Sequence, residues 1–179
     1  MPEAVVSTIG HDRPGLVNEL SALVHANGLN ITDSRMTVLG GEFAVLMCVS
    51  GGETALDAFA TELEQLAHAQ ALAHVFRKTT RRDVGDALPC QVRVVAMDHP
   101  GIVWRVAGFF SDRGVNIRDL ETRTVRAPHT GTSIFDLNML VEVPAEFSVA
   151  ELRDTFDAFC RTEDLDGDLR TSTPTNQSP

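Results

Sequence analysis

The sequence predicts an α+β protein in which the same βαββαβ unit occurs twice. Three observations predict it: a pair of motifs that recurs at a fixed offset, two helical periodicities in each copy, and strands of alternating apolar residues between them. The chain has 179 residues, of which 43% are hydrophobic and 22% are charged. This composition is typical of a globular chain with a buried core, and the length accommodates two small domains.

The internal repeat is exact in spacing over its best-preserved part. Residues 12–17, Asp-Arg-Pro-Gly-Leu-Val, recur as Asp-His-Pro-Gly-Ile-Val at 98–103, and residues 28–33 recur at 114–119, both shifted by 86 positions. Over the 22 positions from 12 to 33, eight residues are identical in the two copies. Recurrence at a fixed period indicates a duplicated structural unit.

Each copy begins with a strand and a helix. Residues 4–9 and 90–97 are rich in β-branched and apolar residues, as in strands. The next segment has apolar residues at i, i+1, i+4, i+7 and i+8, which form one face of a helix. Pro14 and Pro100 are expected to begin these helices, because a missing amide costs nothing in the first turn. Gly28 and Gly114 are expected to end them in a left-handed turn.

A hairpin follows in each copy. Strands are expected at 30–38 and 116–126, and each precedes a run in which every second residue is apolar. The alternating residues are Phe43, Val45, Met47 and Val49 in the first copy and Phe135, Leu137, Met139 and Val141 in the second. Their offset is 92, so the second hairpin is six residues longer, and residues 127–133 hold the insertion.

A second amphipathic helix and a last strand complete each copy. The helix contains Leu56, Phe59, Leu63 and Leu66 in the first copy and Val149, Leu152, Phe156 and Phe159 in the second, with the same spacing. Residues 73–79 are a good strand sequence. Their counterpart at 165–171 contains Asp166, Gly167 and Asp168, which strands disfavour, so the sequence leaves the last strand of the second copy open.

The element order is the ferredoxin-like split βαβ arrangement, in which two helices cover one face of a four-stranded antiparallel sheet. We expect a first domain at 1–80, a linker at 81–89 and a second domain at 90–171. Residues 172–179 are too polar to pack and are predicted to form a disordered tail.

The loops at Asp12 and Asp98 are the candidate site. Each leads from a strand to a helix N-terminus, where unpaired amides and the helix dipole favour an anion such as a carboxylate. Gly15 and Gly101 would let a ligand approach the backbone. The alternative is structural: the aspartates cap the helices while proline and glycine shape the turn.

Helix length decides where such a ligand sits. A helix over 15–27 rises about 1.5 Å per residue, so Asp12 and Asn30 lie at opposite ends of a rod roughly 20 Å long. One domain therefore does not close both residues around a small molecule. Two domains packed side by side in antiparallel fashion would bring the Asp12 loop near Asn116 and the Asp98 loop near Asn30, which makes two related sites.

The motif Asp-x-Pro-Gly followed by Gly-x-Asn-Ile-x-Asp resembles that of the ACT domain, and two such domains alone resemble the glycine cleavage system transcriptional repressor family. The resemblance implies a small amino acid of the glycine or serine type, bound at a domain interface. Position 10 is Gly and its equivalent is Ala96, so the polar side chain of some family members is absent in both copies. The implied ligand-binding residues are Asp12, Pro14, Gly15, Leu16, Asn30, Asp98, Pro100, Gly101, Ile102 and Asn116.

Charge and motif content argue against several functions. The net charge of −10 disfavours direct nucleic-acid binding, and the one basic cluster, Arg77, Lys78, Arg81 and Arg82, is interpreted as a solvated edge. No apolar run reaches the roughly 18 residues of a membrane span, and we expect a cytoplasmic protein. Three cysteines in no paired motif predict neither disulfides nor zinc. The six histidines have no metal spacing, no nucleophile motif occurs, and we expect no catalytic residues, metal or cofactor.

We therefore expect a non-enzymatic regulatory protein, a homodimer, that senses an amino acid and acts through a partner protein, with transcriptional control of glycine metabolism as the implied setting. Two alternatives stay open. The chain could be the ACT regulatory part that accompanies a separate enzyme of the formyltetrahydrofolate deformylase type, or a dimerisation module without a ligand.

Overall fold

The computed structural model describes residues 1–80, 86–126 and 131–172. Most of the expected linker, part of the hairpin insertion at 127–133 and nearly all of the expected tail lie outside the described residues. The chain divides into two compact units, Met1–Asp83 (unit 1) and Val84–Pro179 (unit 2). Each is described by itself below.

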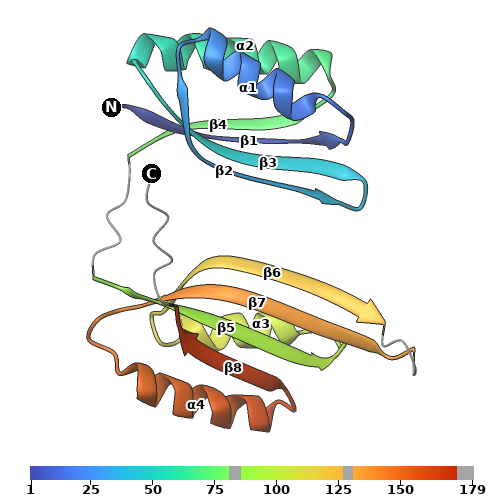
Figure 1. The fold of residues 1–179 in the computed structure, drawn as a ribbon, viewed down its shortest axis with the longest axis vertical. Coiled ribbons are helices and arrows are strands. Elements are labelled where there is room, and N and C mark those ends of the chain that lie inside the picture. The colour runs from blue at the N-terminus through green and yellow to red at the C-terminus, as the bar shows by residue number, and fades with distance from the viewer. Residues whose placement is uncertain (81–85, 127–130, 173–179) are drawn as a thin grey trace. The chain divides into compact units, whose positions relative to one another are not determined.

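Unit 1 has the predicted βαββαβ order. Its sheet is antiparallel with the strand order β2-β3-β1-β4, and α1 and α2 lie on one side of it (Figure 1). The elements are β1 (Glu3–His11), α1 (Leu16–Ala26), β2 (Asn30–Leu39), β3 (Glu42–Ser50), α2 (Glu53–Ala69) and β4 (Ala73–Thr79).

Unit 2 repeats this topology with the strand order β6-β7-β5-β8, and α3 and α4 lie on one side of its sheet. Its first strand begins two residues before the expected end of the linker, because Leu88 and Pro89 pair with β7. The elements are β5 (Leu88–Met97), α3 (Ile102–Ser111), β6 (Asn116–Arg126), β7 (Ser133–Val143), α4 (Val149–Thr162) and β8 (Asp166–Thr171). The ferredoxin-like prediction is confirmed for both units.

Each unit has its own core between the sheet and its two helices. The predicted alternation is confirmed on β3 and on the second half of β7, where every second side chain is buried. The core of unit 2 contains a cluster of rings, in which Phe156 lies 5.2 Å from Phe109 and 5.4 Å from Phe110 between ring centroids. Unit 1 buries one polar side chain, Thr8, whose hydroxyl has no hydrogen-bond partner among the described residues.

The predicted helix ends are confirmed. Gly28 and Gly114 both have φ of 66°, a left-handed conformation that glycine adopts without strain. The amide that follows each glycine donates back to the helix, from Leu29 to the Val24 carbonyl at 3.1 Å and from Val115 to the Phe110 carbonyl at 3.0 Å. These bonds satisfy carbonyls that the helix end would leave unpaired.

The last strand of unit 2, which the sequence left open, forms as β8 and pairs with β5 over six residues. Leu169 anchors it by packing in the core. Gly167 is required by space, because a Cβ there would lie 2.3 Å from the Cys160 sulfur on α4. Packing and ladder hydrogen bonds thus outweigh the poor strand propensity of the two aspartates.

The edge strands β2 and β6 carry the same irregularity. The pairing register shifts between Ile31 and Asp33 on β2 and between Ile117 and Asp119 on β6, so one extra residue bulges from each strand. In β2 the extra residue is Thr32, whose hydroxyl donates to the Cys48 carbonyl at 3.3 Å. The bulge fixes which side chains of the edge strand face the helices.

Candidate functional site

Both candidate loops take the same backbone path. Gly15 has φ of 91° and Gly101 has φ of 98°, and the helices begin directly afterwards at Leu16 and Ile102. The prediction that Pro14 and Pro100 begin the helices is therefore wrong by two residues. A left-handed glycine interrupts the right-handed helical conformation, so each proline lies in the turn before its helix.

Among the described residues, no side chain caps α1 or α3. The N-cap residues are the two glycines, and neither N-cap has a side-chain capping hydrogen bond. The structural alternative, in which Asp12 and Asp98 cap the helices, is wrong. Their backbone amides instead donate to the neighbouring hairpin, to the Gly41 carbonyl at 3.2 Å and the Ser133 carbonyl at 3.0 Å. The first-turn amides, which have no partner within the helix, are left to an external acceptor.

The loop of unit 1 borders a hollow. Its walls come from the loop, the first turns of α1, and strands β2 and β3. It therefore gathers Asp12, Gly15 and Leu16 of the predicted set in unit 1, with Pro14 in the turn between them. The lining residues are Asp12, Arg13, Gly15, Leu16, Val17, Asn18, Ser21, Met36 and Phe43.

Arg13 braces this loop against α1. Its guanidinium donates to both carboxylate oxygens of Glu19, at 2.8 and 2.6 Å, which is the two-point geometry that arginine forms with carboxylates. This hydrogen bonding lowers the pKa of Glu19. Unit 2 has His99 and Arg105 at the two positions, and Arg105 pairs with Glu163 at the end of α4 instead. The two loops therefore present different charges around the same backbone.

The predicted asparagines lie far from these loops in their own units. Asn30 pairs with Ser50 at one end of β3, whereas the strand before the Asp12 loop ends where His11 pairs with Glu42. Eight residues of β3 separate the two ends, which is about 26 Å at 3.3 Å per residue. Unit 2 has the same arrangement for Asn116. One unit alone does not bring aspartate and asparagine together, as the helix length predicted.

The two asparagines have different neighbours. The Asn116 amide donates to Glu142 at 3.0 Å, and Arg118 lies 3.7 Å from the same carboxylate. Asn30 faces Ser50 at the equivalent position, where no charge is present. A ligand at Asn116 would therefore meet a carboxylate, and one at Asn30 would not.

Trp104 lies beside the second loop, and the repeated motifs did not identify it as a candidate. It lies in the first turn of α3, three residues after Gly101, and its side chain is 77% exposed. Its equivalent in unit 1, at the offset of 86, is Asn18, which lines the hollow at the first loop. The same offset that revealed the repeat could have identified this position.

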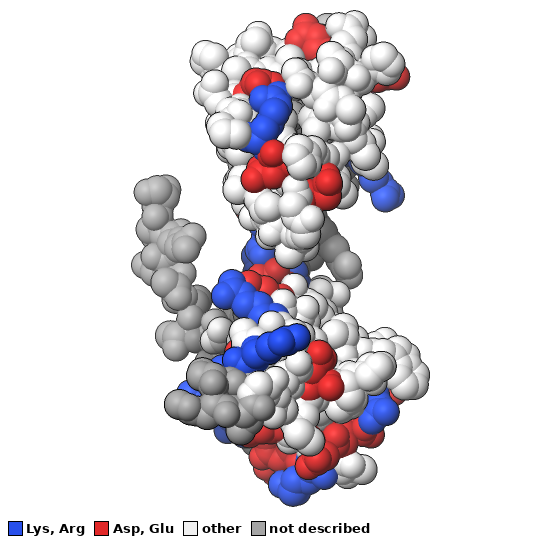
Figure 2. Space-filling view, turned by 90° about the vertical axis from the view of Figure 1, so that its right-hand side faces the viewer, with Lys and Arg blue, Asp and Glu red and all other residues white. Residues whose placement is uncertain are grey.

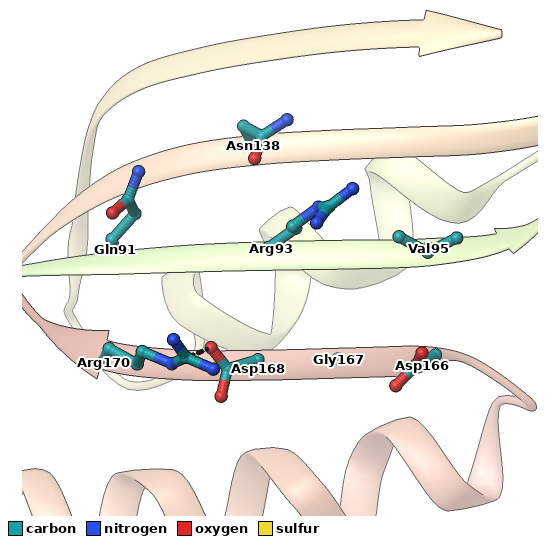
Figure 3. Close-up of a pocket in the computed structure, with 8 residues that line it drawn as sticks. All are labelled: Gln91, Arg93, Val95, Asn138, Asp166, Gly167, Asp168 and Arg170. Atoms are coloured by element: carbon teal, nitrogen blue, oxygen red, sulfur yellow. Dashed lines mark ion pairs between the residues drawn. The ribbon is translucent and has the colours of Figure 1, made fainter. Parts of the chain in front are cut away.

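A second hollow lies on the helix-free face of the unit 2 sheet. Figure 3 shows Arg93 projecting from β5, with Asn138 on β7 and Asp166 and Asp168 on β8. Arg93 pairs with Asp136 at 2.9 Å and Arg170 pairs with Asp168 at 2.6 Å, so the cations are matched by nearby carboxylates. The sequence signal was the charge at alternate positions of β8, where Asp166, Asp168 and Arg170 occur, together with Arg93 on β5.

The described residues show no metal centre. They contain no group of three or more His, Cys, Asp or Glu side chains placed to hold an ion. His11 lies at the end of β1 and His99 lies in the second loop, at different positions of the repeat. Among the described residues, no helix is both long and apolar enough to cross a membrane.

Two ACT domain models match the chain, over residues 3–77 and over residues 91–158. With the fold and the duplicated loops, these matches define the class: the chain belongs to the ACT domain family and carries two domains in tandem.

Two curated relatives match the chain over most of its length. The chain is 29% identical to the glycine cleavage system transcriptional repressor of Escherichia coli (strain K12) over 167 residues, which is 92% of this chain and 87% of that protein. The protein of the same name from Shigella flexneri matches equally.

Solved structures agree. A putative glycine cleavage system transcriptional repressor has a TM-score of 0.75 at 28% identity, covering 96% of this chain and 98% of its own. A protein of unknown function from Galdieria sulphuraria has a TM-score of 0.78 at 27% identity, covering 96% and 99%. The chain is thus a regulatory ACT-domain protein related to the glycine cleavage repressor.

Proposed function

We propose that this protein is a non-enzymatic cytoplasmic sensor of a small amino acid, of the glycine or serine type, and that it regulates a partner protein. The observation that carries the proposal is the uncapped helix N-terminus behind a left-handed glycine, present twice. At each loop the first-turn amides and the helix dipole suit a carboxylate. The relation to the glycine cleavage repressor supports the choice of ligand and the setting in control of glycine metabolism.

A second ACT module completes each site in this proposal, because the aspartate loop and the asparagine of one unit lie at opposite ends of the sheet. The ligand carboxylate is held by the helix amides. The amide of Asn30 or Asn116 supplies a hydrogen bond from the second module. Leu16 and Ile102 close the apolar side at the start of each helix, where both are buried.

Binding at the two loops is separable by experiment. Trp104 is the single tryptophan and the chain has no tyrosine, so tryptophan fluorescence reports the loop of unit 2 while calorimetry counts both. Titration with glycine, serine and the other amino acids should give heat and a fluorescence change for one small amino acid. If no amino acid produces a heat of binding, the result would contradict the proposal and favour the ligand-free dimerisation module.

Loop variants assign the sites. Asp98→Asn should abolish the fluorescence change and leave the heat of binding at the unit 1 loop. Asp12→Asn should leave the fluorescence change and abolish the heat of binding at the unit 1 loop. Removal of a charged hydrogen-bonding group costs about 1.5 to 3 kcal/mol, or at least about ten-fold in affinity. The matched control is Asp112→Asn, at the other end of α3. Equal effects of the control and the loop variants would contradict the assignment.

Regulation requires that ligand and partner affect each other. We propose a coupling typical of allosteric proteins, about 1 to 3 kcal/mol, so the amount of copurified partner should change with the bound amino acid. Copurification that is indifferent to every amino acid would contradict the sensor function. A partner that proves to be a catalytic chain would support the alternative of a regulatory module for a separate enzyme.

A further inference from the structure

The sheet of unit 1 has one face that no helix covers, because α1 and α2 both pack on the other face (Figure 1). Strand pairing arranges the side chains of this open face in rows across the four strands. From β2 to β4, the three central rows are Asp33, Cys48, Val5 and Arg77; Arg35, Leu46, Ser7 and Val75; and Thr37, Ala44, Ile9 and Ala73.

The middle of this open face is apolar and exposed. Ile9 and Leu46 are each 48% exposed and Val75 is 62% exposed, on three adjacent strands. Only small or uncharged side chains lie between them. Single exposed apolar residues are ordinary, but a contiguous patch framed by polar residues marks an interaction surface.

Charges lie at the two margins of this open face. Asp33 on the edge strand β2 and Arg77 on the edge strand β4 belong to one row. Neither forms an ion pair with another described residue. A two-fold axis parallel to the strands would place β2 of one copy over β4 of a second copy at the same height. Each Asp33 would then face an Arg77, twice in the pair.

We propose that the open face of unit 1 binds the same face of a second copy of this chain, in the two-fold arrangement that pairs Asp33 with Arg77. Two sheets packed face to face lie about 10 Å apart with nearly aligned strands, and their apolar side chains interdigitate. The contact is isologous, so one patch of apolar residues and one pair of opposite charges suffice. The proposal is independent of amino-acid binding.

The size of the face sets the strength of the contact. Four strands about 4.8 Å apart and nine residues long at about 3.3 Å each give a face of roughly 20 by 30 Å, or about 600 Å² per copy. This is below the ~800 Å² per partner of a standard specific interface. The dimer should therefore be weak and should dissociate on dilution.

Unit 2 supplies an internal comparison. Its open face has the same strand rows, but Asn138 replaces Leu46 and Asp168 replaces Val75 at equivalent positions. The apolar centre is thus a property of unit 1 alone. Figure 2 shows another side of the molecule, on which basic and acidic side chains lie close together on unit 2.

The first test transfers unit 2 residues to unit 1 in the full chain. Sedimentation or light scattering over a range of concentrations should show a monomer–dimer equilibrium. Leu46→Asn and Val75→Asp should each weaken it at least ten-fold. The matched control is Val125→Asp, an equally exposed apolar residue on the open face of unit 2, which should leave dimerisation unchanged. A chain that is monomeric at every concentration, or a dimer that ignores Leu46→Asn and Val75→Asp, would overturn the proposal.

The second test addresses the arrangement. Asp33→Arg and Arg77→Asp alone should each weaken the dimer, because each places like charges opposite one another, and the double variant should restore it. Cys48 lies in the same row, and its alkylation should slow as protein concentration rises. A double variant no better than the singles, or alkylation independent of concentration, would rule out this pairing.

Discussion

The two units share every element, the same left-handed glycines and the same edge-strand bulge, yet they differ in what they bury and what they expose. Unit 1 has apolar side chains at the centre of its open face and buries a hydroxyl that has no partner among the described residues, whereas unit 2 has charged side chains at the centre of its open face and fills its core with rings. The difference teaches that one backbone geometry accommodates two different cores and two different surfaces.

The largest expected difference concerns the ring cluster of unit 2. Phe156→Ala should destabilise unit 2 by about 3 to 5 kcal/mol, because it removes a buried ring and leaves a cavity. Its equivalent in unit 1, at the offset of 93, is Leu63. Phe156→Leu should therefore cost less than Phe156→Ala. Hydrogen exchange read by mass spectrometry reports each unit separately, and equal loss of protection in unit 1 would show that the two cores are not independent.

The second expected difference is an alkaline pH dependence that two buried cysteines give to unit 2. Burial raises the pKa of Cys160 from 9.0 to about 11 and also raises the pKa of Cys90. The folded state therefore holds these protons more tightly, so this stabilisation is complete below pH 9 and is lost as pH rises from about 9 to about 11. For Cys160 the loss is on the order of 3 kcal/mol at 1.36 kcal/mol per pKa unit.

The chain suits this measurement because it has no tyrosine and a single lysine, Lys78 in unit 1. The equivalents of Cys90 and Cys160 in unit 1 are Ala4 and Ala67, both buried. Replacing both cysteines by alanine should remove the alkaline slope of unit 2 in urea unfolding. A slope that survives in the double variant would assign it to other groups.

The smallest expected effect comes from Thr8. Its buried hydroxyl has no partner among the described residues, and unit 2 has Val94 at the equivalent position. Thr8→Val should stabilise unit 1 by roughly 1 kcal/mol, because an unsatisfied buried hydroxyl costs about 1 to 3 kcal/mol. The reciprocal change, Val94→Thr, should destabilise unit 2. Thermal unfolding of both variants checks the pair, and a destabilising Thr8→Val would indicate that the hydroxyl is satisfied in solution.

Local periodicity predicted most of the fold. The repeat at 86 located both first helices, and alternation located β3 and β7, because these patterns record which side of an element is buried. The strand β8 and the helix starts were beyond such patterns. In the sequence alone, Gly167 disfavours a strand, and only the fold shows that the Cys160 sulfur leaves no space for a larger residue there. The left-handed conformation of Gly15 likewise depends on the loop around it.

The candidate site was likewise predictable in part: its loops could be predicted from the sequence, but the side-chain contacts around them could not. The sequence identified the loops, and helix length correctly separated Asp12 from Asn30. It did not reveal that Asn116 donates a hydrogen bond to Glu142 or that Arg13 donates one to Glu19. Such contacts join side chains of different elements, and their relative positions are set only in the folded structure.

The bulge at Thr32 has a consequence for solubility. β2 is long, lies at the edge of its sheet and has almost every side chain exposed, a combination that invites edge-to-edge growth into fibrils. The extra residue twists the strand locally and breaks the straight run of free backbone groups that an incoming strand would need. The equivalent bulge in β6 has the same effect on the sheet of unit 2, so each unit has its own protection against aggregation.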